Sequence, residues 1–191
     1  MKNRRRNLIL LTLLAFLGVV FLCLALRPRE PTYRGKRLST WLQSLHIGKW
    51  VEAEEAREAV KEMGTNALPT LIRMLGTRDP FLKRQLQHLS FRYPLVGRFY
   101  DSKADPPGLA WMGFRVLGSR AKPAVPQLIE MLGHEDDSIR SRVASSLESI
   151  GPSAFPELLE AYRTGNSRVS AGAATVLYSI DLQAAVKAGV K

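Results

Sequence analysis

The side chains of this chain that could do catalytic or metal chemistry are few and scattered. Its three histidines, His46, His88 and His134, lack metal-ligand spacing with one another or with carboxylates. The acidic run from Glu135 to Asp137 could attract a cation, but a solvated turn that caps the next helix explains it more simply. We therefore predict that the chain has no metal site.

Nucleophilic and phosphate-binding motifs are also missing from the sequence. Ser141, Ser145 and Ser146 lie in a helical segment with neither a nucleophile elbow nor a recognisable base. No Gly-x-x-x-x-Gly-Lys loop is present to hold phosphates. The single cysteine, Cys23, excludes an intramolecular disulfide and a cysteine-based metal site. We predict no catalytic residue, no cofactor and no enzymatic activity.

The chemistry that the sequence does offer is that of a contact surface. Residues 91–114 hold six aromatic residues, and basic side chains are interleaved with them from residue 83 onward. Tyr, Trp and Arg are the residue types that most often anchor protein interfaces. In the alternative interpretation, the aromatic residues fill gaps in an irregular fold and the cations are solvated. The candidate partner-binding surface consists of Arg84, Arg92, Tyr93, Arg98, Phe99, Tyr100, Lys103 and Trp111.

Charge is distributed unevenly along the 191 residues, whose formal net charge is +11. Residues 1–28 carry five basic and no acidic side chains, and residues 29–122 carry 17 basic and 9 acidic ones. Residues 123–191 carry 6 basic and 8 acidic ones. Attraction for an acidic partner or for lipid head groups would therefore belong to the first two-thirds of the chain.

Amphipathic helices must position the aromatic and basic side chains of the candidate surface. Three of the predicted helices share one pattern. Each has apolar side chains at helical spacing and a proline directly after the first. The three are Leu68/Leu71/Ile72/Leu75, Val125/Leu128/Ile129/Leu132 and Phe155/Leu158/Leu159/Tyr162. Glycines 64, 118 and 151 stand before them, where a left-handed residue would end the preceding helix. Upstream, Leu38, Trp41, Leu42 and Leu45 form one apolar face, and residues 52–63 form another helix.

The second helix of each repeat recurs as well. Ile139, Val143, Leu147 and Ile150 are matched 30 positions later by Val169, Ala173, Leu177 and Ile180. Asp137 and Asn166-Ser167 supply residues of the capping type before these two helices. A helix pair of this size cannot bury both of its faces alone, so neighbouring pairs must stack.

The repeated phrase also carries a family resemblance. Gly-x-x-Ala-x-x-Ala-Val-Pro-x-Leu-Ile-x-x-Leu spans residues 118–132, followed by Asp-Asp-Ser-Ile-Arg and Ala-x-x-Leu-x-x-Ile-Gly. In these residues the chain resembles the HEAT-repeat family, particularly its short bacterial variety, over about residues 50–80 and 108–181. The resemblance implies an all-α fold, a short right-handed α-solenoid of stacked antiparallel helix pairs, with a binding role and no inherited catalytic residues. It also implies that Asp137 and Arg140 help to tie adjacent repeats together, whereas Asn166 and Arg168 depart from that pattern in the next copy.

The middle of the predicted solenoid, which we assign to residues 38–191, is irregular. The spacing from Pro69 to Pro126 is 57 residues, against 30 from Pro126 to Pro156. The surplus near residues 83–108 is either a decayed repeat or an insertion, and Asp105 to Gly108 is expected to close it as a loop.

The N-terminal region predicts attachment to a membrane. Residues 8–26 form an uncharged run of 19 residues, roughly 28 Å long as a helix, close to the thickness of a hydrocarbon core. We predict a transmembrane signal-anchor helix there, after a basic tail over residues 1–7 and before a linker over residues 27–37. A cleaved secretory signal is the alternative. The basic tail favours a cytoplasmic N-terminus, with the C-terminal domain outside a bacterial inner membrane.

The function predicted from these observations is that of a single-pass, membrane-anchored scaffold that binds another protein without catalysis. The alternative is a basic solenoid that binds nucleic acid, which requires a cytosolic domain and strongly salt-dependent binding. A third class, a HEAT-like repair enzyme, would need a carboxylate and an aromatic pair in a concave basic groove. The sequence does not define the partner or the oligomeric state.

Overall fold

A computed structural model of the chain describes residues 30–77 and 106–190. The predicted basic tail (1–7) and transmembrane helix (8–26) lie outside these residues. Within the described ranges, no helix is both long enough and apolar enough to cross a membrane.

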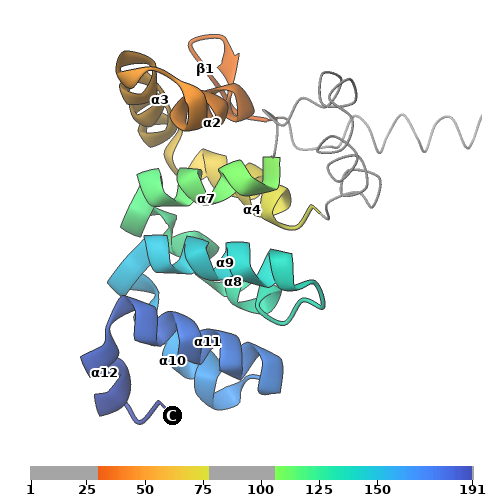
Figure 1. Ribbon diagram of the computed structural model, residues 1–191, viewed down its shortest axis with the longest axis vertical. Coiled ribbons are helices and arrows are strands. Elements are labelled where there is room, and N and C mark those ends of the chain that lie inside the picture. The colour runs from red at the N-terminus through yellow and green to blue at the C-terminus, as the bar shows by residue number, and fades with distance from the viewer. Residues whose placement is uncertain (1–29, 78–105, 191) are drawn as a thin grey trace, which may run out of the picture.

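The described residues are mostly helical (Figure 1). The N-terminal elements are β1 (Thr32–Tyr33), β2 (Lys36–Arg37), α2 (Leu38–Ile47), α3 (Trp50–Met63), η1 (Gly64–Ala67) and α4 (Leu68–Leu75). The C-terminal elements are α7 (Pro106–Leu117), η2 (Gly118–Ala124), α8 (Val125–Met131), α9 (Asp137–Ile150), η3 (Gly151–Ala154), α10 (Phe155–Thr164), α11 (Ser167–Ile180) and α12 (Leu182–Lys187).

The repeated glycine-to-proline phrase folds the same way in all three copies. A longer helix ends at a glycine with positive φ, namely Gly64 (53°), Gly118 (52°) or Gly151 (74°), as the sequence predicts. A short 3-10 segment follows, and the next helix then begins with proline in its first turn, where the missing N–H loses no hydrogen bond. These corners contact one another, η1 on η2 and η2 on η3, so the chain turns at one edge of the stack.

The helices form two layers, and Figure 1 shows the helix pairs stacked along the long axis of the molecule. In one layer α7 packs on α9 and α9 packs on α11. In the other layer α8 packs on α10, and α4 continues the series by contacting η2. Short turns join α8 to α9 and α10 to α11, so each pair is antiparallel, and α4 packs directly on α7. The predicted stacking of helix pairs is therefore present over the described residues.

The core consists of the apolar stripes that the sequence predicts. Leu71, Leu128 and Leu158 occupy the same position of the three short helices, and all are fully buried. Burial of one such leucine stabilises a fold by roughly 1.5–3 kcal/mol. The longer helices bury Ala56, Ala59, Val60, Met63, Ile139, Val143, Leu147, Ile150, Ala173 and Leu177. The apolar core is continuous from α2 to α12.

One close contact fixes the position of α7. A Cβ atom at Gly113 would lie 2.5 and 2.9 Å from the two methyl carbons of Leu71 and 3.3 Å from a methyl carbon of Leu42. These leucines are themselves fully buried, so they have little room to move. Glycine therefore lets α7 approach α4 and α2 more closely than any other residue would.

The described part of the predicted linker contains regular secondary structure. Residues 32–37 form a two-stranded antiparallel hairpin in which Tyr33 pairs with Lys36. Its turn has positive φ at Arg34 (49°) and Gly35 (75°), as two-residue hairpin turns of type I′ require. The hairpin packs on α2, where the Trp41 Nε1–H donates a hydrogen bond to the Tyr33 carbonyl at 3.1 Å.

The irregular middle lies mostly outside the described residues, and its origin as a decayed repeat or an insertion stays a prediction. The expected loop over residues 105–108 is wrong in its described part, because Pro106 to Gly108 form the first turn of α7. Prolines fit there because the first turn of a helix needs no N–H donors.

Candidate functional site

Of the eight residues predicted to form a partner-binding surface, Trp111 is the one that the structure describes. The other seven, from Arg84 to Lys103, lie outside the described residues. Trp111 is half-buried near the middle of α7. The guanidinium of Arg115, one helical turn further along, lies over its ring at 4.6 Å from the centroid. This cation–π contact holds a flat aromatic side chain and a cation together on the outer face of α7.

Trp111 and Arg115 line a groove between α7 and α9 with a volume of about 550 Å³. Three small side chains, Ser141, Ser145 and Ser149, form the opposite wall at one-turn spacing along α9. Serines leave room beside the indole that a longer side chain would fill. The other lining residues are Gly108, Arg142 and Glu148. The groove therefore has one large aromatic wall and one small polar wall.

Some of the polar side chains of this groove have no partner among the described residues. The Ser149 hydroxyl donates to the Ser145 carbonyl at 2.8 Å, whereas the structure gives the hydroxyls of Ser141 and Ser145 no partner among the described residues. Arg115 stacks on Trp111 and makes no hydrogen bond or ion pair within the same part of the chain. Its guanidinium N–H donors face solvent and could bind a carboxylate or a carbonyl oxygen.

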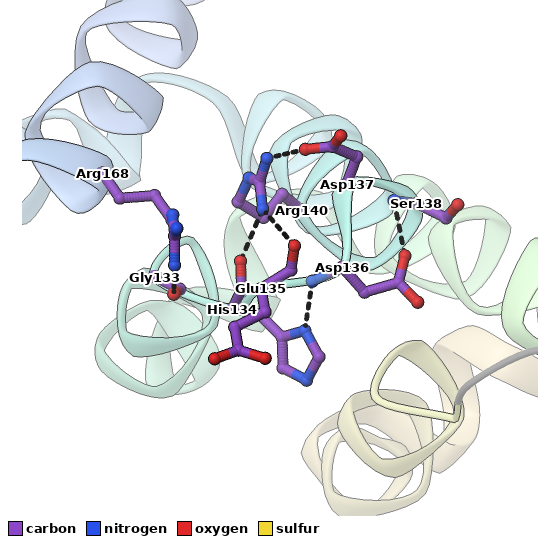
Figure 2. A network of polar contacts seen from close by, with 8 residues as sticks. All are labelled: Gly133, His134, Glu135, Asp136, Asp137, Ser138, Arg140 and Arg168. Carbon is purple, nitrogen blue, oxygen red and sulfur yellow. Dashed lines mark hydrogen bonds and ion pairs between the residues drawn. The ribbon is translucent and has the colours of Figure 1, made fainter.

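The turn between α8 and α9 holds the two residues that the family resemblance implies for tying repeats. Figure 2 shows Arg140 at the centre of this turn, where it forms an ion pair with Asp137. Its Nη1 donates to the carbonyls of His134 at 2.6 Å and Glu135 at 2.9 Å. All of these contacts lie within one turn and one helix, so Arg140 stabilises the turn locally.

The N-cap of α9 is Asp136, one residue before the position expected from the sequence. Its carboxylate accepts a hydrogen bond from the Ser138 N–H at 2.9 Å, whereas Asp137 is the first residue of the helix. That hydrogen bond is the main reason why the pKa of Asp136 lies below its ordinary value. The expected cap Asn166 does cap α11, accepting from Arg168 N–H at 3.1 Å and Val169 N–H at 3.0 Å.

Two arginines make polar contacts that cross between repeats. Arg168 of α11 donates from Nη1 to the Gly133 carbonyl at 3.4 Å, a contact also drawn in Figure 2. Arg142 of α9 donates from Nη2 to the Thr77 carbonyl at 3.3 Å. Both carbonyls lie just beyond the C-terminal end of a short helix, where cations are favoured. The role of Arg142 is not predictable from local sequence, because its partner is 65 residues away.

The histidines do not form part of a metal-binding cluster over the described residues. His134 Nδ1 accepts a hydrogen bond from the Asp136 N–H at 3.0 Å, which gives it a place in the turn. His46 lies on α2, far from His134 in the sequence, and His88 is outside the described residues. Throughout residues 30–77 and 106–190, no group of three or more His, Cys, Asp or Glu side chains could hold a metal ion.

Comparison with known proteins supports the family resemblance for part of the chain. No curated protein and no solved structure matches it. Residues 102–177, which include most of α7 to α11, match the family model described as HEAT repeats. This match supports the assignment of that region to the HEAT-repeat family.

Proposed function

We propose that this chain is a non-catalytic scaffold that binds another protein in the groove between α7 and α9. The observation that carries this proposal is the Trp111–Arg115 stack beside a hollow of about 550 Å³. Trp and Arg dominate the binding energy of many protein interfaces when they lie beside a pocket that excludes water. HEAT repeats generally mediate protein–protein interaction, which agrees with this role.

The construction of the groove suits binding better than catalysis. Its walls are two helices fixed by a shared core, so a ligand would meet a preformed surface. Two of its serine hydroxyls and the Arg115 guanidinium can form hydrogen bonds with a peptide backbone or side chain. None of the lining residues is a histidine, so no serine of the groove has an imidazole base within it.

We also propose that residues 8–26 anchor the scaffold as a single membrane-spanning helix. The support is the uncharged run of 19 residues, 14 of which are Leu, Ile, Val or Phe. The basic tail of residues 1–7 would stay in the cytoplasm, which places the binding groove on the outer side of a bacterial inner membrane.

Photo-cross-linking in cells tests the binding role. A photoreactive amino acid at Ser145 lies in the groove, and one at Glu58, on the exposed face of α3, serves as the control. We expect a reproducible adduct with one protein from position 145 and none from position 58. The same adducts from both positions, or an adduct with nucleic acid alone, would contradict the proposal.

Membrane attachment and orientation need a separate experiment. We expect the full chain to stay in the membrane during alkaline extraction and a chain lacking residues 1–29 to be released. Protease should cleave the C-terminal domain in spheroplasts and spare it in intact cells. Protection in spheroplasts would place the domain in the cytosol and favour the nucleic-acid alternative, whose phosphate contacts are predicted in residues 83–122, partly outside the described residues.

A further inference from the structure

A second groove lies between α8 and α10, in the other layer of the stack. Its volume is about 430 Å³. One wall is formed by Pro126, Ile129 and Glu130 of α8, and the other by Glu157, Glu160, Ala161 and Thr164 of α10. These positions repeat at three- and four-residue intervals, so each wall is one stripe of a helix. Gly165, Asn166 and Val169 complete the lining.

The apolar lining residues form the floor of this second groove. Ile129 and Val169 are half-buried, and Ala161 is buried. The small side chain of Ala161 leaves space that an aliphatic side chain of a ligand could occupy. Covering this surface would remove apolar area from water and favour binding.

The charged residues around the apolar floor are all acidic. Glu130, Glu157 and Glu160 line the groove, and none of its lining residues is Lys or Arg. Glu157 Oε1 lies 3.5 Å from Lys122 Nζ at the margin, while its Oε2 is buried without a hydrogen-bond donor among the described residues. Glu130 and Glu160 make no ion pair among the described residues, so both can pair with a cation of a ligand.

The acidic character is specific to this junction of the stack. Glu130 and Glu160 are 30 residues apart and hold the same position in successive repeats. The corresponding residue of α4, 57 positions before Glu130, is Arg73. The short helices therefore share their buried leucines but change the sign of charge on their outer face.

From this geometry we propose that the α8–α10 groove binds an extended segment of a protein partner with Lys or Arg next to an aliphatic residue. The aliphatic side chain would lie on Ile129 and Ala161, and the cation would pair with Glu130 and Glu160. Nucleic acid would be repelled from this groove by the same carboxylates. The inference rests on the proposed scaffold function and adds a second surface to it.

Fluorescence anisotropy with a defined probe tests this assignment. The probe is a short labelled peptide that carries Lys, Arg and Leu in a Gly/Ser background, and the full chain is kept in non-ionic detergent. We expect binding that weakens as the salt concentration rises from about 0.1 M to about 1 M. Over this range the Debye length, the distance over which charges interact, falls from about 10 Å to about 3 Å. A matched peptide with Glu in place of Lys and Arg should not bind.

Paired variants locate the binding site. Glu130→Gln combined with Glu160→Gln should weaken binding of the basic peptide by roughly fivefold or more, since two ion pairs are lost. Glu58→Gln combined with Glu62→Gln removes the same charge from the exposed face of α3 and should leave binding unchanged. Equal binding by both double variants, or binding of the Glu peptide, would overturn the proposal.

A zero-length carbodiimide cross-link identifies the occupant directly. We expect Glu130 or Glu160 to link to the lysine of the added peptide. Links to Lys83 or Lys103 of this chain instead would show an internal occupant and overturn the assignment to a partner. If the peptide fails to bind while the Ser145 cross-link persists, this second groove is refuted and the scaffold function stands. Loss of the Ser145 adduct alone would refute the first groove.

Discussion

The grooves on the two layers of this solenoid differ in chemistry although both are built from repeated helices. Between α7 and α9, an aromatic ring with a stacked arginine faces a row of serines. Between α8 and α10, three carboxylates surround an apolar floor. Inward positions such as Leu71, Leu128 and Leu158 are uniform because the shared core constrains them. Outward positions are free of that constraint, so each face can be adapted to a different ligand.

This comparison predicts that a change in the core disables both grooves together. Phe114 of α7 is fully buried in the apolar core and lies next to Gly113. We expect Phe114→Ala to lower the free energy of unfolding by roughly 3–5 kcal/mol because it leaves a cavity. Urea unfolding followed by circular dichroism measures the change. Phe114→Leu, which keeps most of the volume, should cost less; an equal loss from both variants would argue against the cavity explanation.

A change at Trp111 should separate the two grooves. We expect Trp111→Ala to reduce partner capture at the α7–α9 groove by about 2 kcal/mol of binding free energy, while basic-peptide binding at the α8–α10 groove is unchanged. The measurements are the yield of the Ser145 adduct and peptide anisotropy. Trp50→Ala is the matched control, since Trp50 is 89% exposed and lies on α3. A parallel loss at both grooves would mean that Trp111 supports the fold instead of one surface.

Substitution of Asn166 tests how much the N-cap of α11, at the end of the α8–α10 groove, contributes to stability. Asn166→Ala removes the acceptor for two N–H groups of α11, and we expect it to cost about 1 kcal/mol of stability. Asn66→Ala makes the same substitution at an exposed residue of η1. Thermal unfolding should show a lower Tm for Asn166→Ala and almost no change for Asn66→Ala. Similar decreases in Tm for both variants would mean that lost capping does not explain the destabilisation.

The smallest expected effect is a dependence of stability on pH. It arises because the N-cap of α9, Asp136, is a carboxylate. Hydrogen bonding to Ser138 N–H lowers the pKa of Asp136 in the folded state. Its stabilisation is therefore complete above the unfolded-state pKa and is lost as the pH falls through the folded-state pKa. We expect the stability difference between the native chain and Asp136→Asn to shrink on acidification. A difference that stays constant across that range would show that the charge of Asp136 is irrelevant to capping.

Much of the fold could be predicted from the sequence because its determinants are local and repeated. Gly64, Gly118 and Gly151 mark the corners, and the apolar stripes mark the buried faces. The N-cap of α9 was placed one residue late because Asp136 and Asp137 are chemically alike. Only the backbone distinguishes them, since Asp136 is extended with ψ of 116° and Asp137 is already helical. The hairpin was missed although Arg34-Gly35 is a suitable two-residue turn.

The grooves were harder to predict because they combine residues from different repeats. Trp111 was named from its residue type, but its partner Arg115 follows only from helical spacing, and the serine wall lies about 30 residues further along the chain. The acidic groove was missed altogether. A signal for it exists, since the 30-residue repeat places Glu130 and Glu160 in register. That signal becomes visible when the outward positions are aligned as carefully as the buried ones.

The missing side chain at position 113 has a mechanical consequence. With Leu71 methyl carbons 2.5 and 2.9 Å from the site where a Cβ would stand, the Leu71 side chain fills the space up to the backbone of α7. Even alanine at this position would force α7 away from α4 or displace Leu71. Because α7 also forms one wall of the first groove, that displacement would change the width of the groove without altering any residue that lines it.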